Sequence, residues 1–194
     1  MFNTKDALEL FAKYRGDAIV VPGRGGRHWI NISEGPMDVP LGDPAMGGHC
    51  GFALGLAMAL PKRRVVLIDS EGDLQMSLSV LMTVAEQKPA NFYHFMLDNE
   101  CYGTTGGQPV PNAKNVQYDL IAKGAGYPRA YAFTELEAFG KALPEIMNGP
   151  GPVFVAMKVV PEVENEAIGV RKRWIRRTKN QAIADMRKEL RIGV

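Results

Sequence analysis

The stretch VVLIDSEGDLQMSLSVLMTVAEQKPANFYHFMLDNECYGTTGGQ, residues 65–108, contains two apolar segments that each end in acidic or amide side chains. Residues 65–68 form a short β-branched run, which is typical of a strand buried on both faces. Residues 92–97 form the second such strand, and apolar residues between the two recur at helical spacing, which predicts one helix. The helical positions are Leu74, Leu78, Leu81 and Ala85.

Two strands joined by one helix are expected to be parallel, through a right-handed crossover. The polar turn at 69–73 and the polar turn at 98–99 therefore lie at the same end of the predicted sheet. Carboxylate and amide oxygens gathered at one edge, next to the start of a helix, are suited to a divalent cation and a phosphate group. Further strands alternate with helices toward the C-terminus, which predicts an α/β protein with a doubly wound parallel sheet in three layers.

The same stretch resembles the cofactor-diphosphate motif of thiamine-diphosphate-dependent enzymes, which opens with Gly-Asp-Gly and closes with Asn-Asn or Asp-Asn. The resemblance extends from about Leu41 to Val160. It is particularly to the branch containing the β subunit of sulfopyruvate decarboxylase and the C-terminal part of phosphonopyruvate decarboxylase, where the closing turn reads much like DNECYGTTGGQP. The resemblance implies the thiamine-diphosphate-binding fold of a diphosphate-binding (PP) domain.

The opening turn departs from Gly-Asp-Gly and allows two alignments. In one, Gly72-Asp73-Leu74 is the motif, Asp73 binds the metal, and the spacer to the closing turn has 23 residues. In the other, Ser70-Glu71-Gly72 fills the motif, the spacer has 25 residues, and Glu71 replaces the metal-binding aspartate. We favour the second alignment because the leucines of the helix then fall in phase. Asp73 then stands where the family has a small neutral residue facing phosphate, and its carboxylate repels a diphosphate unless it turns to the metal or to solvent.

The closing turn carries the other residues that the resemblance assigns to metal and diphosphate. Asn99 matches the family's metal-binding amide, and the backbone carbonyl of Cys101 matches the next ligand. With a carboxylate, a water molecule and two diphosphate oxygens, they complete an octahedron suited to Mg²⁺. Gly103, Thr104 and Thr105 follow, and their N–H groups and hydroxyls are expected to reach the diphosphate oxygens.

A segment rich in small residues, 46–57, resembles the family's Ser-Met-Gly segment. In the family, the side chain at the Met46 position holds the two cofactor rings in a bent shape. The carbonyl at the Pro44 position accepts a hydrogen bond from the pyrimidine amino group. His49 stands where the family has small residues, and only a phosphate or interface contact suggests itself there. The expected cofactor-binding residues of this segment and of the opening turn are Pro44, Met46, Gly47, Gly72, Asp73 and Leu74.

A glycine-arginine loop follows the first predicted strand, which covers 17–22. Arg24 and Arg27 in this loop can bind an anionic substrate group or carboxylates of a partner chain, and a solvated turn is the alternative. His28 is the candidate catalytic proton-transfer group, with an ordinary surface position as the alternative. His94 lies in the middle of a strand, which predicts a hydrogen-bonded core histidine.

The composition favours a cytoplasmic globular protein. The chain has 194 residues, 46% of them hydrophobic and 23% charged, which suits one domain with a sizeable core. A formal net charge of +2 is too small to indicate nucleic-acid binding. Cys50 and Cys101 provide no disulfide framework, and we find no apolar run of signal or membrane-spanning length.

We divide the chain into a diphosphate-binding domain, 1–160, and a basic helical extension, 161–194. From Arg171 onward the extension is rich in arginine and lysine. Asp185 and Glu189 interrupt the positive charge, which favours contact with a partner subunit over nucleic acid. The apolar face of the expected helix contains Ile175, Ala182, Met186 and Leu190.

The resemblance implies the diphosphate- and Mg²⁺-binding subunit of a thiamine-diphosphate-dependent carbon–carbon lyase. The expected reaction is decarboxylation of a small anionic 2-oxo acid, such as sulfopyruvate or phosphonopyruvate, or cleavage of a bond next to a carbonyl. In the family, the glutamate that activates the cofactor comes from a pyrimidine-binding (PYR) domain, and nothing here resembles that domain. We therefore expect a separate PYR subunit, self-association, and activity only in the heteromer. A scaffold subunit without cofactor is the alternative; a 2-oxo acid oxidoreductase subunit is a further one.

Overall fold

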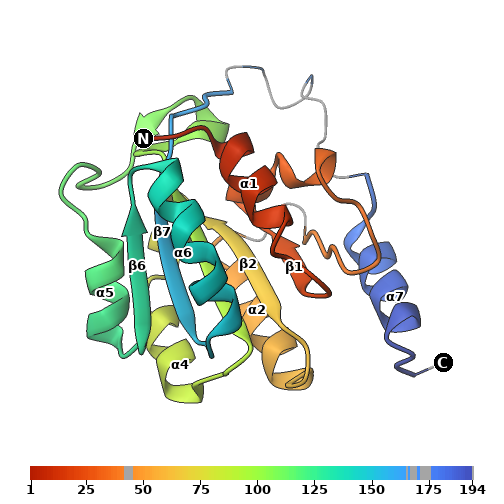
Figure 1. Cartoon of the computed structure of the whole chain (residues 1–194). Helices are drawn as coiled ribbons and strands as arrows, with labels where there is room; N and C mark the ends of the chain where they lie inside the picture. Colours follow the sequence, from red (N-terminus) through yellow and green to blue (C-terminus); the bar gives the residue numbers. More distant parts are fainter. Residues whose placement is uncertain (42–45, 165, 167–169, 171–175, 194) are drawn as a thin grey trace.

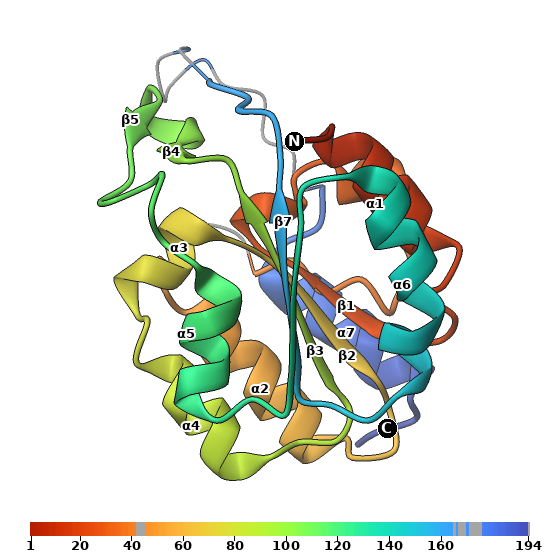
Figure 2. The ribbon, with the colours of Figure 1, turned by 60° about the vertical axis from the view of Figure 1, so that its left-hand side comes forward.

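Five parallel strands form the central sheet in this computed structural model, which describes residues 1–41, 46–164, 166, 170 and 176–193. The order across the sheet is β1-β2-β3-β7-β6. The strands are β1 (Ile19–Pro22), β2 (Val65–Ser70), β3 (Phe92–Asp98), β6 (Arg129–Phe133) and β7 (Val153–Lys158). A separate antiparallel ribbon, β4 (Cys101–Tyr102) with β5 (Gln108–Pro109), lies above the carboxyl end of the sheet (Figure 2).

Helices cover both faces of the sheet, so the predicted three-layer, doubly wound α/β fold is confirmed (Figure 1). One face carries α2 (His49–Ala59), α3 (Glu71–Met76), α4 (Val80–Gln87), α5 (Tyr118–Ala125) and α7 (Lys179–Glu189). The other carries α1 (Thr4–Ala12) and α6 (Leu136–Asn148). Short 3-10 turns are η1 (Arg24–Gly26), η2 (Trp29–Asn31) and η3 (Gly103–Thr105). The connections from β1 to β6 use the first face and the return to β7 uses the second, as right-handed crossovers require.

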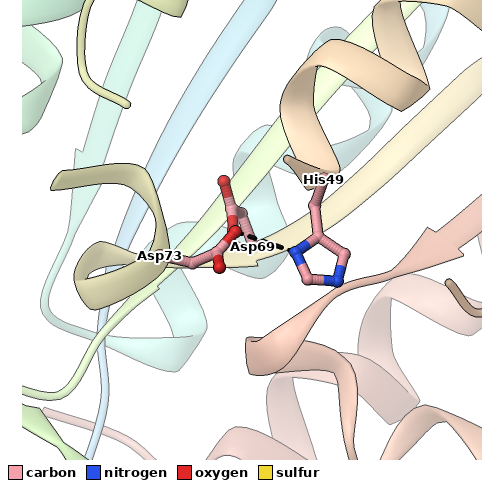
Figure 3. Close-up of side chains that lie close together, drawn as sticks. All are labelled: His49, Asp69 and Asp73. Atoms are coloured by element: carbon pink, nitrogen blue, oxygen red, sulfur yellow. Dashed lines mark hydrogen bonds and ion pairs between the residues drawn. The ribbon is translucent and has the colours of Figure 1, made fainter. Parts of the chain in front are cut away.

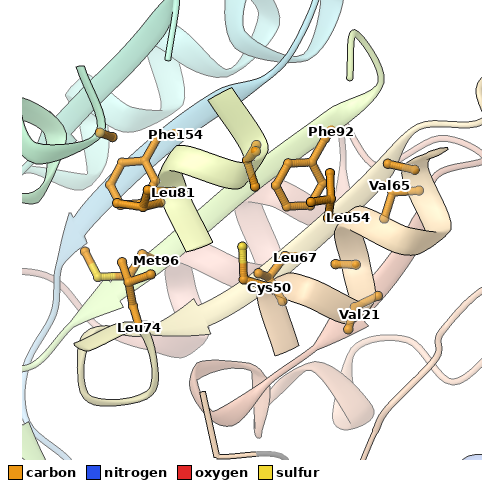
Figure 4. Packing of buried hydrophobic residues seen from close by; sticks show 14 of the residues in the cluster. Val21, Cys50, Leu54, Val65, Leu67, Leu74, Leu81, Phe92, Met96 and Phe154 are labelled. Atoms are coloured by element: carbon orange, nitrogen blue, oxygen red, sulfur yellow. The ribbon is translucent and has the colours of Figure 1, made fainter. Parts of the chain in front are cut away.

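The β-branched runs form strands because both of their faces are buried. In β2, Val65 and Leu67 face the α2 side, whereas Val66 and Ile68 face the α1 side, and all four are fully buried. Figure 4 shows the first of these two layers, with Phe92 and Phe154 of the neighbouring strands beside them. Burial on both faces fixes the register of neighbouring strands, and the register determines where the polar turns after β2 and β3 lie relative to each other.

The prediction of a single helix between β2 and β3 is wrong, because the segment forms two helices, α3 and α4. α3 ends at Met76, and Ser77 has an extended φ of −144°. The hydroxyl of Ser77 donates to the carbonyl of Gly47 at 2.5 Å, and these two residues are 30 positions apart in the sequence. This tertiary bond, together with the weak helix propensity of serine, breaks the helix before α4 begins.

The basic extension ends in a helix that packs on this chain's own domain. Thr178 caps α7 with a complete capping box, and Ala182 and Met186 are buried in the core layer that also contains α2. Arg177 donates to the carbonyls of Gly35 and Asp38, which ties the start of α7 to the segment beside β1. Ile175 of the expected apolar face lies outside the described residues. Among the described residues, no helix combines the length and apolar character needed to cross a bilayer.

We expect Met186→Ala to lower the free energy of unfolding by about 2–5 kcal/mol, because the side chain is 4% exposed and its removal leaves a cavity. Lys188→Ala, two residues further along on the exposed side of α7, is the matched control and should change the free energy of unfolding by less than about 0.5 kcal/mol. Urea denaturation measures both. Equal stability of the two variants would contradict the docking of α7 on this domain.

Candidate functional site

The two polar turns meet at the carboxyl end of β2 and β3. Glu71 is the first residue of α3, and its Oε1 accepts a hydrogen bond from the N–H of Cys101 at 3.1 Å. Oδ1 of Asn99 accepts from the same N–H at 3.0 Å, so both oxygens converge on one amide. Glu100, between Asn99 and Cys101, adopts a left-handed φ of 64°, a conformation rarely adopted outside glycine, which turns the chain back toward α3.

Glu71 is buried in a position that disfavours its charge. Its side chain is 0% exposed, and Oε2 has no hydrogen-bond partner among the described residues. Burial, and to a smaller extent the charge of Asp98, raises the pKa of Glu71 from 4.5 to about 8. Lys158 Nζ binds Asp98 Oδ2 at 2.8 Å, so this ammonium group pairs with Asp98 and not with Glu71. A buried carboxylate with one free oxygen is suited to a cation.

Asp73, the other candidate metal ligand, points elsewhere. Its Oδ1 accepts from the N–H of Gly47 at 2.9 Å, and its Oδ2 binds Nδ1 of His49 at 2.8 Å (Figure 3). Both carboxylate oxygens of Asp73 therefore have protein partners, whereas Oε2 of Glu71 has none among the described residues. The geometry favours the alignment in which Glu71 fills the metal-binding position and Asp73 lies beside it.

The other candidate cofactor-binding residues lie in different surroundings. A Cβ on Gly72 would lie 2.9 Å from the ring of Tyr102, so only glycine lets that ring cover the turn. Leu74 is 1% exposed in the core, which leaves only its backbone for a cofactor contact. Met46 is 60% exposed next to Gly47, and Pro44 lies outside the described residues.

The glycine loop after β4 stands next to the shared amide. Gly103, Thr104 and Thr105 form η3, and Thr105 Oγ1 donates to the carbonyl of Tyr102 at 3.3 Å. The carbonyl of Gly103 accepts from the N–H of Glu164 at 2.8 Å, so the segment after β7 crosses this loop. The structure thus brings together the metal candidates and the diphosphate candidates at one edge of the sheet.

Arg27 and His28 bind carboxylates of their own chain. Arg27 contacts Glu162 and Glu164, each at 2.5 Å, and His28 Nε2 lies 2.6 Å from Glu162 Oε2. Although burial opposes ionisation of Glu162, hydrogen bonds from His28 and Arg27 lower its pKa. The candidate proton-transfer group is therefore hydrogen-bonded to a carboxylate 134 residues further along the chain, and no local sequence pattern indicates this contact.

Buried polar side chains form a hydrogen-bonded series behind the site, and the sequence predicted only part of it. His94 Nε2 binds Asp69 Oδ2 at 3.0 Å, and Cys50 Sγ lies 3.8 Å from His94 Nδ1, so the predicted core histidine is confirmed. His49, Asp69 and Asp73 bring ligand-type atoms within 4.8 Å of one another. Protein groups already bind the carboxylates of Asp69 and Asp73. Sequence reasoning missed the pairing of His49 with Asp73, although both residues depart from small ones in the resembling family.

The donor set suits Mg²⁺ with thiamine diphosphate. Glu71 supplies a carboxylate oxygen that has no partner within the described ranges, Asn99 supplies an amide oxygen, and Cys101, whose N–H both side chains bind, supplies a backbone carbonyl. These are hard oxygen ligands of the kind that Mg²⁺ takes alongside phosphate oxygens. The residues present therefore fit a magnesium-bridged diphosphate.

Comparison with known proteins identifies a family and similar relatives. The family described as thiamine pyrophosphate enzyme, C-terminal TPP binding domain, matches residues 23–157. Sulfopyruvate decarboxylase subunit beta of Methanothermobacter thermautotrophicus is 30% identical over 186 residues, covering 92% of this chain and 97% of that protein. Phosphonopyruvate decarboxylase of Streptomyces viridochromogenes is 34% identical over 158 residues, covering 80% of this chain and 39% of that protein.

Solved structures agree on the fold. Benzoylformate decarboxylase from Polynucleobacter necessarius superposes with a TM-score of 0.66 at 17% identity, covering 81% of this chain and 33% of that one. The chain thus spans about a third of this enzyme and less than half of the phosphonopyruvate decarboxylase, but nearly all of the sulfopyruvate decarboxylase subunit.

The raised pKa of Glu71 predicts a pH-dependent stability. The metal-free folded chain keeps a proton on Glu71 that the unfolded chain releases above about pH 4.5, so wild type loses stability relative to Glu71→Gln as the pH rises toward about 8. Mg²⁺ should restore stability to wild type above pH 7 and not to the variant. Denaturant unfolding between about pH 5 and about pH 9 measures this.

Glu86→Gln, which removes an exposed carboxylate on α4, is the control and should follow wild type. A difference between wild type and Glu71→Gln that stays constant with pH would show that Glu71 ionises freely.

Proposed function

The chain belongs to the thiamine pyrophosphate enzyme family, C-terminal TPP binding domain, and from this premise we propose that it is the diphosphate- and Mg²⁺-binding subunit of a thiamine-diphosphate-dependent decarboxylase. One observation carries the proposal. Glu71 and Asn99, from turns 28 residues apart, share one backbone N–H, and Glu71 keeps a buried oxygen with no partner in the part of the chain that the structure describes. Such an oxygen costs stability unless a cation takes it up.

Within this proposal each part of the site has a task. Glu71, Asn99 and the carbonyl of Cys101 would hold Mg²⁺, and the N–H groups and hydroxyls of η3 would bind the diphosphate. Met46, exposed beside Gly47, would pack against the cofactor rings. When bound, thiamine diphosphate supplies the electron sink for the carbon–carbon bond cleavage, while the protein binds, orients and excludes water.

The proposed substrate is a small 2-oxo acid with a second anionic group. The names of two relatives, sulfopyruvate decarboxylase subunit beta and phosphonopyruvate decarboxylase, support this class. Arg27 and His28 lie at the rim of the same sheet edge and already bind carboxylates, so they are suited to an anionic group that displaces Glu162. Cleavage of another bond next to a carbonyl is the neighbouring reaction that assays should include.

The proposed assembly is a heteromer with a pyrimidine-binding subunit that supplies the activating glutamate. The relative matched over 97% of its length is called subunit beta. A second support is α2, which contains no Asp, Glu, Lys or Arg, yet exposes Gly51, Gly55 and Met58. A helix that is apolar all round is usually buried, so a partner subunit or a second copy is expected on this face.

Titration of the chain, together with any subunit that copurifies, with thiamine diphosphate and Mg²⁺ tests the cofactor assignment. Wild type should bind, and both Glu71→Gln and Asn99→Ala should weaken binding by at least about tenfold, because each removes a metal ligand. Glu86→Gln is the charge-matched control. Absence of binding heat for wild type would instead support a scaffold subunit that has lost the cofactor.

The partner assignment predicts no turnover by the chain alone. With thiamine diphosphate and Mg²⁺, decarboxylation of sulfopyruvate or phosphonopyruvate should begin only when a subunit carrying the pyrimidine-binding domain is added. Met58→Glu should reduce copurification of a partner, because it places a charge in the apolar face of α2, whereas Lys188→Glu should not. Turnover by the isolated chain would contradict the heteromer.

A further inference from the structure

The turn before α2 is held in place from the side of α3. Gly47 has a left-handed φ of 71°, its N–H donates to Asp73 Oδ1 at 2.9 Å, and its carbonyl accepts from Ser77 Oγ at 2.5 Å. Both backbone polar groups of Gly47 thus depend on side chains of one segment.

Asp73 is in turn held by His49. The two side chains are each 3% exposed and meet at 2.8 Å, with His49 on α2 and Asp73 on α3 (Figure 3). An ionised carboxylate only accepts hydrogen bonds, so Nδ1 of His49 carries the hydrogen.

The neighbouring carboxylate, Asp69, accepts from His94 Nε2 and from the N–H of Ser70, and it also lies against Asp73. His49 Nδ1 binds Asp73. Asp73 lies in the first turn of α3, at the position where the resembling family has a small neutral residue facing phosphate, so a carboxylate released from His49 is placed to turn toward the proposed diphosphate. Like charges at such a site repel, and the repulsion is strong where water is excluded.

We propose that His49 is a positioning residue for cofactor binding: its Nδ1 keeps the Asp73 carboxylate turned toward the Gly47 turn and away from the diphosphate. This inference rests on the proposed function. It accounts for two departures from the small residues of the family as one compensated pair, in which an acid beside the diphosphate is tolerated because a histidine binds it.

Three variants separate positioning from simple packing. His49→Phe keeps the ring but loses the donor, His49→Asn keeps a donor at the position of Nδ1, and His49→Phe with Asp73→Asn removes the carboxylate charge while an amide oxygen still accepts from Gly47. Thiamine diphosphate is titrated at fixed Mg²⁺ against the full chain with any copurifying subunit. Ile146→Val, in the opposite core layer, is the control for mild loss of stability.

We expect His49→Phe to raise the Kd for thiamine diphosphate by about tenfold or more, the effect of losing a hydrogen bond to a charged group. His49→Asn should stay within about threefold of wild type, and the double variant should recover most of the loss. A packing role predicts the opposite, since the double variant disturbs the core at two positions. His49→Ala replaces His49→Phe, with the same expectation, where the phenyl ring prevents folding.

A double variant that binds no better than His49→Phe, or a His49→Phe that binds like wild type, overturns the inference while leaving the proposed function standing. Wild type that binds no thiamine diphosphate overturns both. Ile146→Val should bind like wild type; weakened binding by this control would show that lost stability alone lowers affinity, which also contradicts positioning by His49.

Discussion

The N–H of Cys101 is shared by two oxygens, one from the turn after β2 and one from the turn after β3, and this contact joins the corners on which the site depends. The parallel sheet makes the contact possible, because adjacent strands end at the same edge and their register is fixed by burial on both faces. Without this shared amide, Glu71 would lose a hydrogen bond that offsets its burial. With it, Glu71 and Asn99 present oxygens toward a common point.

The arrangement costs the metal-free chain stability. Glu71 is fully buried, one of its oxygens has no hydrogen-bond partner among the described residues, and its pKa lies near 8, so ionising it at neutral pH lowers the stability of the fold. Its acidic neighbours have partners: Lys158 binds Asp98, and His49 binds Asp73. Glu71 is thus costly to ionise, as expected where stability is given up for binding.

Local sequence pattern predicted the strands, the layers and the meeting of the two turns, because β-branched runs and helical spacing are local signals. It failed where a distant contact decides. Ser77 ends α3 by binding Gly47, which no pattern near Ser77 reveals. The direction taken by Asp73 depends on His49, 24 residues earlier, and the pairing of Arg27 depends on the segment after β7. Propensity cannot register such contacts, since they exist only once the sheet has formed.

We propose that the turns after β2 and β3 together hold a magnesium-bridged diphosphate. Anomalous diffraction can locate the metal in crystals of the chain, with any copurifying subunit, grown with thiamine diphosphate and Mn²⁺ in place of Mg²⁺. We expect one manganese peak within coordination distance of Glu71 Oε2, Asn99 Oδ1 and the carbonyl of Cys101. A peak among His49, Asp69 and Asp73 instead, or a bound diphosphate with no metal at Glu71, would contradict it.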